Sequence, residues 1–268
     1  MTSKLDKKYL EIILKPIRIC SHYKPKLGRG GKTGYSLSDF QKLYQEDALY
    51  SWFGLDNPLM YAAHKAAGGM TSIYRQIGIG CEHLFRQILQ DKLDLSPDDT
   101  TWSYTIRASG NRTRKLSLDG RIPLACVRNP NVYKRIEKWI KQAAQDLDVA
   151  PSVIKTLSGA VFEVRQGYKS KDSKRQNADI ANAATAYTKS YLPCVIVLSS
   201  QIDMDIVLRY RAEKWLILTG VLGKNNPLIS TYDFMSSVIG YDLAGFFERN
   251  KKILKREVDS VLKALLTA

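Results

Sequence analysis

Residues 160–191 read AVFEVRQGYKSKDSKRQNADIANAATAYTKSY, and this stretch decides the fold of the chain. Its first five residues, Ala160–Val164, are apolar except for Glu163 and are typical of a buried strand. The segment 174–191 is helix-like and leads to a wholly apolar run, Pro193–Ser199. A carboxylate on a buried strand is costly unless it is paired or holds a metal ion. Glu163 is therefore the first candidate for a functional residue.

The segments that follow continue this alternation of strands and helices. We expect a helix over residues 205–214 and another buried strand at Trp215–Gly220, which reads WLILTG. The order strand, helix, strand, helix, strand is typical of βαβ units in a parallel sheet covered on both faces. Only the first of these strands carries an acid. Its polar continuation, Arg165–Asp172, leaves from the strand's end, where sites gather in open α/β sheets.

The rest of the chain supplies helices and one hairpin. Trp102–Leu124 is expected to form a β-hairpin with a basic tip. Helices are expected at 4–20 with an interruption at Pro16, at Ser38–Tyr50, at Ile73–Leu89, after Asn129 and within 244–268. The predicted fold class is α/β (α+β), with a mixed central sheet flanked by helices and a mainly helical N-terminal part. A turn-rich break near 94–101 separates residues 1–95, for DNA contact or dimerisation, from residues 96–268, unless the two form one continuous domain.

The balance of charge favours a polyanionic partner. The 268 residues carry a net charge of +15, with a pI near 9.6. Nucleic acid is the first such partner and an acidic membrane surface the second, while the alternative is a merely basic protein. Four separated cysteines without a CxxC pair argue against a zinc finger and a disulfide scaffold. No apolar run approaches the ~18–20 residues of a membrane span, so we expect a cytoplasmic protein without membrane contact.

Two basic segments outside the βαβ region are candidates for DNA contact. The glycine-rich segment Lys24–Gly34 contains GKT, but a phosphate loop would need glycine at position 26, where the chain has Lys26. This segment is therefore interpreted as a loop that touches phosphate or is simply solvated. The hairpin tip, SGNRTRK, is interpreted in the same two ways. The DNA-contact candidates of these segments are Arg29, Lys32, Arg112, Arg114 and Lys115.

The sequence FEVRQGYKSKDSKRQNADIANA, followed by the apolar PCVIVLS, resembles the second half of the PD-(D/E)xK nuclease core. The resemblance covers roughly residues 146–220 and is closest in kind to the type II restriction endonucleases. It implies a restriction-endonuclease-like core and Mg²⁺-dependent cutting of double-stranded DNA at a short sequence. It also implies a homodimer, since palindromic sites call for two-fold symmetry, or a heterodimer in which this chain cuts one strand.

The resemblance leaves the identity of the second acid and of the lysine open. Two residues after Glu163 stands Arg165, which can stabilise charge but is a poor proton acceptor. Either Lys169 or Lys171 takes the lysine role, with Asp148, or as second choice Asp119, as the other acid. Otherwise Glu163 is the first acid, and the run Asp172-Ser173-Lys174 supplies the second acid and its lysine. The metal candidates are therefore Glu163, Asp148 and Asp172.

Each of these roles has a structural alternative. Glu163 could be neutralised by Arg165 in an ion pair, and Asp172 could cap the helix that follows it. Lys171, Lys174 and Arg175 would surround that helix N-terminus, a ready phosphate site, with Gln176 on its first turn. Glu82, in the predicted helix Ile73–Leu89, is kept only as an outside candidate for a carboxylate near the site. A non-catalytic nucleic-acid-binding protein and a structure-specific repair or recombination nuclease are the competing functions.

Overall fold

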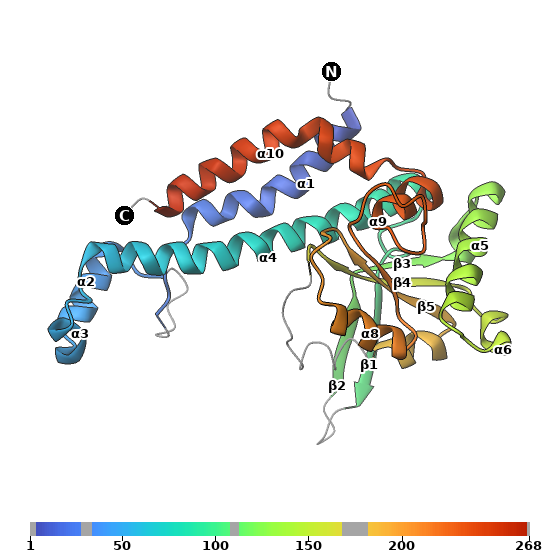
Figure 1. Cartoon of the computed structure of the whole chain (residues 1–268), viewed down its shortest axis with the longest axis horizontal. Coiled ribbons are helices and arrows are strands. Elements are labelled where there is room, and N and C mark those ends of the chain that lie inside the picture. Colours follow the sequence, from blue (N-terminus) through green and yellow to red (C-terminus); the bar gives the residue numbers. More distant parts are fainter. Residues whose placement is uncertain (1–3, 28–33, 108–112, 168–181, 267–268) are drawn as a thin grey trace. The chain divides into compact units, whose positions relative to one another are not determined.

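The computed structural model describes residues 4–27, 34–107, 113–167 and 182–266, and it divides into two compact units (Figure 1). The first unit consists of Met1–Gly80 and Glu248–Ala268, and the second of Cys81–Phe247. Two helices, α4 (Pro58–Leu93) and α10 (Leu243–Leu266), pass from one unit into the other. The last helix of the chain is therefore shared between the units.

The first unit is built from helices in its described residues. It contains α1 (Lys4–Ile19), the 3₁₀ turn Cys20–His22, α2 (Leu37–Gln45), α3 (Ala48–Trp52) and the adjoining parts of α4 and α10. Asp6 of α1 is buried and lies 3.1 Å from Arg249 Nε of α10. The predicted helical N-terminal part is confirmed.

Two predictions about these helices are wrong, the interruption at Pro16 and the helix start at Ile73. Pro16 lies inside α1, where the buried side chains of Ile13 and Ile17 hold the helix on both sides of it. Gly68 and Gly69 lie inside α4, which begins at Pro58 and not at Ile73. A Cβ atom at Gly68 would lie 2.0 Å from the Tyr23 hydroxyl, so this glycine serves close packing and does not end the helix.

A third prediction, one helix over Ser38–Tyr50, is also wrong. Ser36 caps α2, with its side chain accepting a hydrogen bond from the Asp39 N–H. Asp47 then caps α3 by accepting hydrogen bonds from the N–H groups of Leu49 and Tyr50. Because an aspartate cap starts a new helix, the segment forms two helices instead of one.

The second unit is organised on a four-stranded mixed sheet, and this confirms the α/β class with a mixed central sheet. The strands are β3 (Gly120–Pro123), β4 (Gly159–Arg165), β5 (Tyr191–Val197) and β6 (Leu216–Leu218), in that spatial order. β4, β5 and β6 are parallel and β3 is antiparallel to β4. Helical residues 182–188 and α8 (Met204–Ala212) lie between the parallel strands in sequence, as the βαβ pattern predicts. The predicted helix over 174–191 ends too late, because β5 begins at Tyr191.

Neighbouring residues of β4 face opposite sides of the sheet. Phe162 stacks with Trp139 of α5 (Pro130–Asp146) and lies 5.1 Å, ring to ring, from Phe85 of α4. Val161 belongs to a buried cluster on the other face, with Trp102 among its members. The remaining elements of this unit are α6 (Pro151–Ile154), α9 (Thr231–Asp233) and a π-helical turn, Phe234–Ile239.

The hairpin forms a separate two-stranded sheet from β1 (Trp102–Arg107) and β2 (Thr113–Leu118). The prediction that it continues to Leu124 is wrong, because the chain bends at Asp119 and β3 pairs with β4 instead. This bend brings the residue after the hairpin to the edge of the main sheet. Among the helices that the described residues form, none is long and apolar enough to cross a membrane.

Candidate active site

Glu163 lies on β4, as predicted, and is almost completely buried. Arg165 follows on the same face of the strand, because side chains two residues apart point to the same side. Its guanidinium Nη2 forms an ion pair with Glu163 Oε1, and the two side chains are only 9% and 11% exposed. The ion pair expected as the structural alternative is therefore present, and in a nearly buried setting.

A second acid, Asp119, reaches the same strand from the bend between β2 and β3. Its Oδ2 accepts a hydrogen bond from the Val164 N–H, at 2.8 Å. Val164 lies between Glu163 and Arg165, so the Asp119 carboxylate lies beside the short stretch of β4 that carries Glu163. The register explains this position. Gly120 pairs with Phe162 in an antiparallel ladder, so Asp119, the residue before Gly120, comes opposite Glu163, the residue after Phe162.

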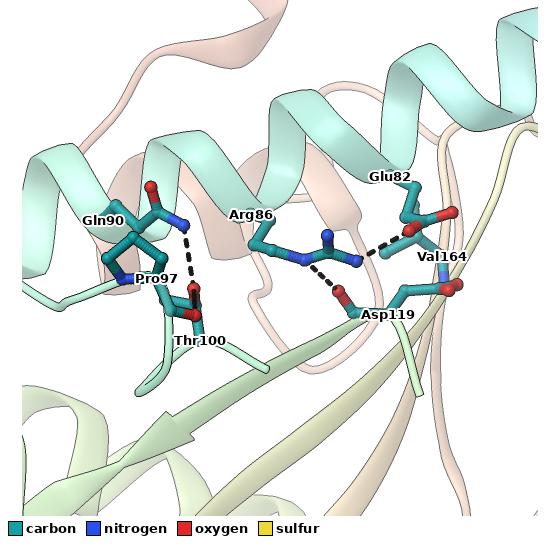
Figure 2. Close-up of polar contacts among 7 residues, drawn as sticks. All are labelled: Glu82, Arg86, Gln90, Pro97, Thr100, Asp119 and Val164. Carbon is teal, nitrogen blue, oxygen red and sulfur yellow. Dashed lines mark hydrogen bonds and ion pairs between the residues drawn. The ribbon is translucent and has the colours of Figure 1, made fainter. Parts of the chain in front are cut away.

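Helix α4 adds a third carboxylate and a second arginine, as Figure 2 shows. Arg86 donates from Nε to the Asp119 backbone oxygen at 2.9 Å and from Nη2 to Glu82 Oε1 at 2.6 Å. Glu82 and Arg86 are four residues apart and therefore lie on one face of the helix. Gly120 permits this approach, because a Cβ atom there would lie 3.0 Å from the Phe85 ring of the same helix.

The electrostatic setting of Asp119 is unfavourable to its charge. Burial, followed by repulsion from Glu82, raises the pKa of Asp119 to about 6. The Val164 N–H, Arg165 and Arg86 oppose this rise without cancelling it. A carboxyl group with a raised pKa and a specific charged neighbour is a frequent feature of functional sites. Asp119 therefore lies where a bound cation would relieve the repulsion between carboxylates.

The residues present suit Mg²⁺ better than a metal ion whose ligands all come from the protein. Within the described parts of the chain, no group of three or more His, Cys, Asp or Glu side chains is arranged to hold a metal ion. Mg²⁺ usually keeps several waters and binds through one or two carboxylates together with substrate phosphates. Asp119 and Glu163 could supply these two carboxylates once Glu163 separates from Arg165.

Of the other predicted site residues, Asp148, Arg114 and Lys115 lie in the described parts of the chain. Asp148 is exposed in the turn between α5 and α6, before β4 begins, whereas Glu163 lies near the carboxyl end of that strand. Lys115 is exposed on β2, and Arg114 belongs to the same strand. The remaining candidates fall outside the described residues: Lys169, Lys171, Asp172, Lys174, Arg175, Gln176, Arg112, Arg29 and Lys32.

Sequence reasoning gave too little weight to three residues. The sequence makes Asp119 only the second choice as an acid and Glu82 an outside candidate, and it indicates no role for Arg86. The available signal was the Asp-Gly pair at 119–120, which marks a sharp change of direction after a strand. Glu82 and Arg86, four residues apart, gave a second signal, since they place opposite charges on one face of the predicted helix.

Comparison of the chain with protein-family models, with curated proteins and with solved structures gave no match. The resemblance to the restriction endonucleases therefore depends on the sequence motifs of this chain alone.

Proposed function

We propose that this chain is a Mg²⁺-dependent endonuclease of the restriction type, which hydrolyses phosphodiester bonds in double-stranded DNA at a short sequence. The observation that carries the proposal is that Asp119, in the bend before β3, accepts a hydrogen bond from Val164, the residue next to Glu163 near the carboxyl end of the parallel strand β4. The net charge of +15 supports a polyanionic substrate.

The residues of the site would have separate roles in such a reaction. A bound Mg²⁺ would supply charge neutralisation and an activated water. Asp119 and Glu163 would hold the ion, and Glu82 would add negative potential from α4. Arg165 would stabilise negative charge on the phosphate, because a guanidinium stays protonated and cannot act as the base. The lysine role stays with Lys169, Lys171 or Lys174 as a prediction.

The ion pair between Glu163 and Arg165 fits a resting state without DNA. A nearly buried carboxylate needs a compensating charge, and Arg165 provides it. A DNA phosphate offers Arg165 an alternative anion with good geometry for a guanidinium. Binding of DNA would therefore release Glu163 at the moment when the ion is needed. This exchange couples formation of the metal site to the presence of substrate.

The same ion pair favours a second candidate function, a DNA-binding protein without catalysis. If Arg165 stays on Glu163 when DNA binds, the carboxylate serves only to keep the arginine in place. Plasmid cleavage separates the two functions. The purified protein is incubated with supercoiled plasmid and Mg²⁺, and in parallel with EDTA. Discrete fragments that disappear with EDTA support the nuclease, and a mobility shift without cleavage supports the binding protein.

Two further measurements define the activity. Sequencing of the fragment ends distinguishes a restriction enzyme from a structure-specific repair nuclease, because scattered ends exclude a fixed recognition sequence. Light scattering of the protein, with and without a DNA duplex that it cleaves, gives its oligomeric state. We expect a homodimer on DNA, since a palindromic site presents two identical strands to two identical chains. A single chain on the duplex would instead favour a heterodimer partner or a monomeric enzyme.

A further inference from the structure

The hairpin β1–β2 has one face that is exposed and carries only hydroxyl and basic groups among its described side chains. Ser103, Thr105, Lys115 and Ser117 are all exposed, and they alternate with buried or half-buried apolar residues. The register pairs Ser103 with Ser117 and Thr105 with Lys115 across the two strands. The four side chains therefore form one continuous patch, which we call the ribbon face.

The opposite face of the hairpin fixes it firmly to the second unit. Trp102, Tyr104 and Leu118 are buried in a cluster that includes Val161 of β4. The Tyr104 hydroxyl also donates a hydrogen bond to Oδ1 of the buried Asn182, in the helical segment 182–188. The ribbon face is therefore presented on a rigid support, which favours a surface that reads the shape and chemistry of a partner.

The charge of the hairpin favours a polyanion as that partner. From Thr101 to Leu118 the sequence has four basic residues and no acidic residue. Serine, threonine and lysine side chains donate hydrogen bonds both to phosphates and to base edges.

The geometry points to the major groove. We propose that β1–β2 lies in the major groove of double-stranded DNA, with the ribbon face against the base edges, and sets the sequence preference of the enzyme. The major groove is about 12 Å wide and admits a two-stranded β-ribbon, whose strands lie about 5 Å apart. Figure 1 shows the hairpin projecting away from the four-stranded sheet.

The chain connects the ribbon face directly to the candidate site. Ser117 is two residues from Asp119, which limits their Cα separation to about 7 Å. Successive base pairs are about 3.4 Å apart, so the end of the ribbon face lies within roughly two base pairs of the acid. A six-residue strand spans about 20 Å, or about six base pairs. One chain should therefore read about six base pairs or fewer, and the cut should fall inside the recognition sequence or at its edge.

This inference depends in part on the proposed function, so its test measures binding and cleavage separately. A library of duplexes with a randomised centre is selected by the wild-type protein with Ca²⁺ in place of Mg²⁺, and the bound DNA is sequenced. The selection is repeated with Thr105→Ala, Lys115→Ala and Ser117→Ala. The matched control is Lys138→Ala, an exposed lysine on α5, which packs against the other face of β4. Melting curves check that each variant is folded.

We expect the wild type to enrich a short motif and the ribbon-face variants to accept more bases at one or more of its positions. Lys115→Ala should weaken binding by about tenfold, the typical effect of losing one good base contact. Lys138→Ala should leave the motif unchanged. If the variants enrich the wild-type motif with wild-type affinity, or if the wild type enriches no motif, the ribbon face is not the reader. If they relax the motif but Mg²⁺ gives no cleavage, the ribbon inference stands and the proposed nuclease function fails.

Discussion

Asp119→Asn should stabilise the protein at neutral pH, although it removes a residue that we place in the active site. In the folded chain, burial and the charge of Glu82 both disfavour the ionised carboxylate of Asp119. Asparagine has nearly the same shape and keeps an oxygen that can accept the Val164 N–H. The substitution therefore removes an unfavourable charge and keeps the hydrogen bond. Active sites commonly sacrifice stability in this way.

The size of the effect follows from the shift in pKa. The pKa of Asp119 rises from 3.8 to about 6 on folding. Each unit corresponds to about 1.4 kcal/mol, so ionised Asp119 costs the folded state about 3 kcal/mol. The folded state holds the proton more tightly than the unfolded state, so this contribution favours folding at low pH. It is lost as the pH rises through the folded value near 6.

Urea unfolding of the wild type and the variant, in EDTA and at several pH values, tests this reasoning. We expect the free energy of unfolding of Asp119→Asn to exceed that of the wild type by about 3 kcal/mol at pH 7.5, and by much less at pH 4.5. Asp98→Asn, at an exposed carboxylate of the same unit, should show no such trend. A difference between wild type and Asp119→Asn that does not change with pH would refute the electrostatic account of this site.

Three other substitutions test particular contacts. Glu82→Gln should reduce the pH-dependent difference between wild type and Asp119→Asn, since repulsion from Glu82 is the second cause of the raised pKa of Asp119. Gly120→Ala should destabilise the protein by about 1–3 kcal/mol in urea unfolding, because its Cβ would press on the Phe85 ring. Arg249→Met should cost about 2 kcal/mol in the same assay, because its half-exposed guanidinium lies 3.1 Å from buried Asp6.

Controls make each result decisive. The pH-dependent difference between wild type and Asp119→Asn should be unchanged by Glu137→Gln, which alters a half-exposed glutamate paired with Lys141 on α5. Gly167→Ala, whose Cβ would meet no atom closer than 3.5 Å, should be nearly neutral, and equal costs at both glycines would contradict the packing argument. Arg18→Met removes ion pairs to the exposed Glu11 and to Glu257, which is 21% exposed against 7% for Asp6, and it should cost under about 1 kcal/mol. A cost as large as that of Arg249→Met would contradict the role given to burial.

The parallel core was predictable because each of its strands is a separate apolar run. Residues buried on both faces leave no polar alternation, so β5 and β6 are visible from composition alone. The glycines of α4 were not predictable, since their role depends on Tyr23 and Leu265, which lie far away in the sequence. A local pattern cannot distinguish a glycine that ends a helix from one that admits a neighbour.

The candidate site was predictable only in part, for the same reason. Glu163 could be identified because an acid is exceptional in a buried strand. Asp119 comes next to it through the pairing of β3 with β4, two strands about 40 residues apart, and the sequence does not encode this register locally. The hairpin pattern even suggested that Asp119 continued a strand of the hairpin. The folded chain was therefore needed to show that Asp119, and not the first choice Asp148, comes opposite Glu163.

The central claim is that Glu163 serves catalysis and is not merely the counter-ion of Arg165. The most direct test is Mg²⁺-dependent plasmid cleavage by Glu163→Gln, measured together with DNA affinity. The control is Glu137→Gln, at a half-exposed ion pair with Lys141. We predict that Glu163→Gln reduces cleavage by at least about a hundredfold and binds DNA as well as, or more tightly than, the wild type. Cleavage by Glu163→Gln at the rate of the wild type would contradict the account.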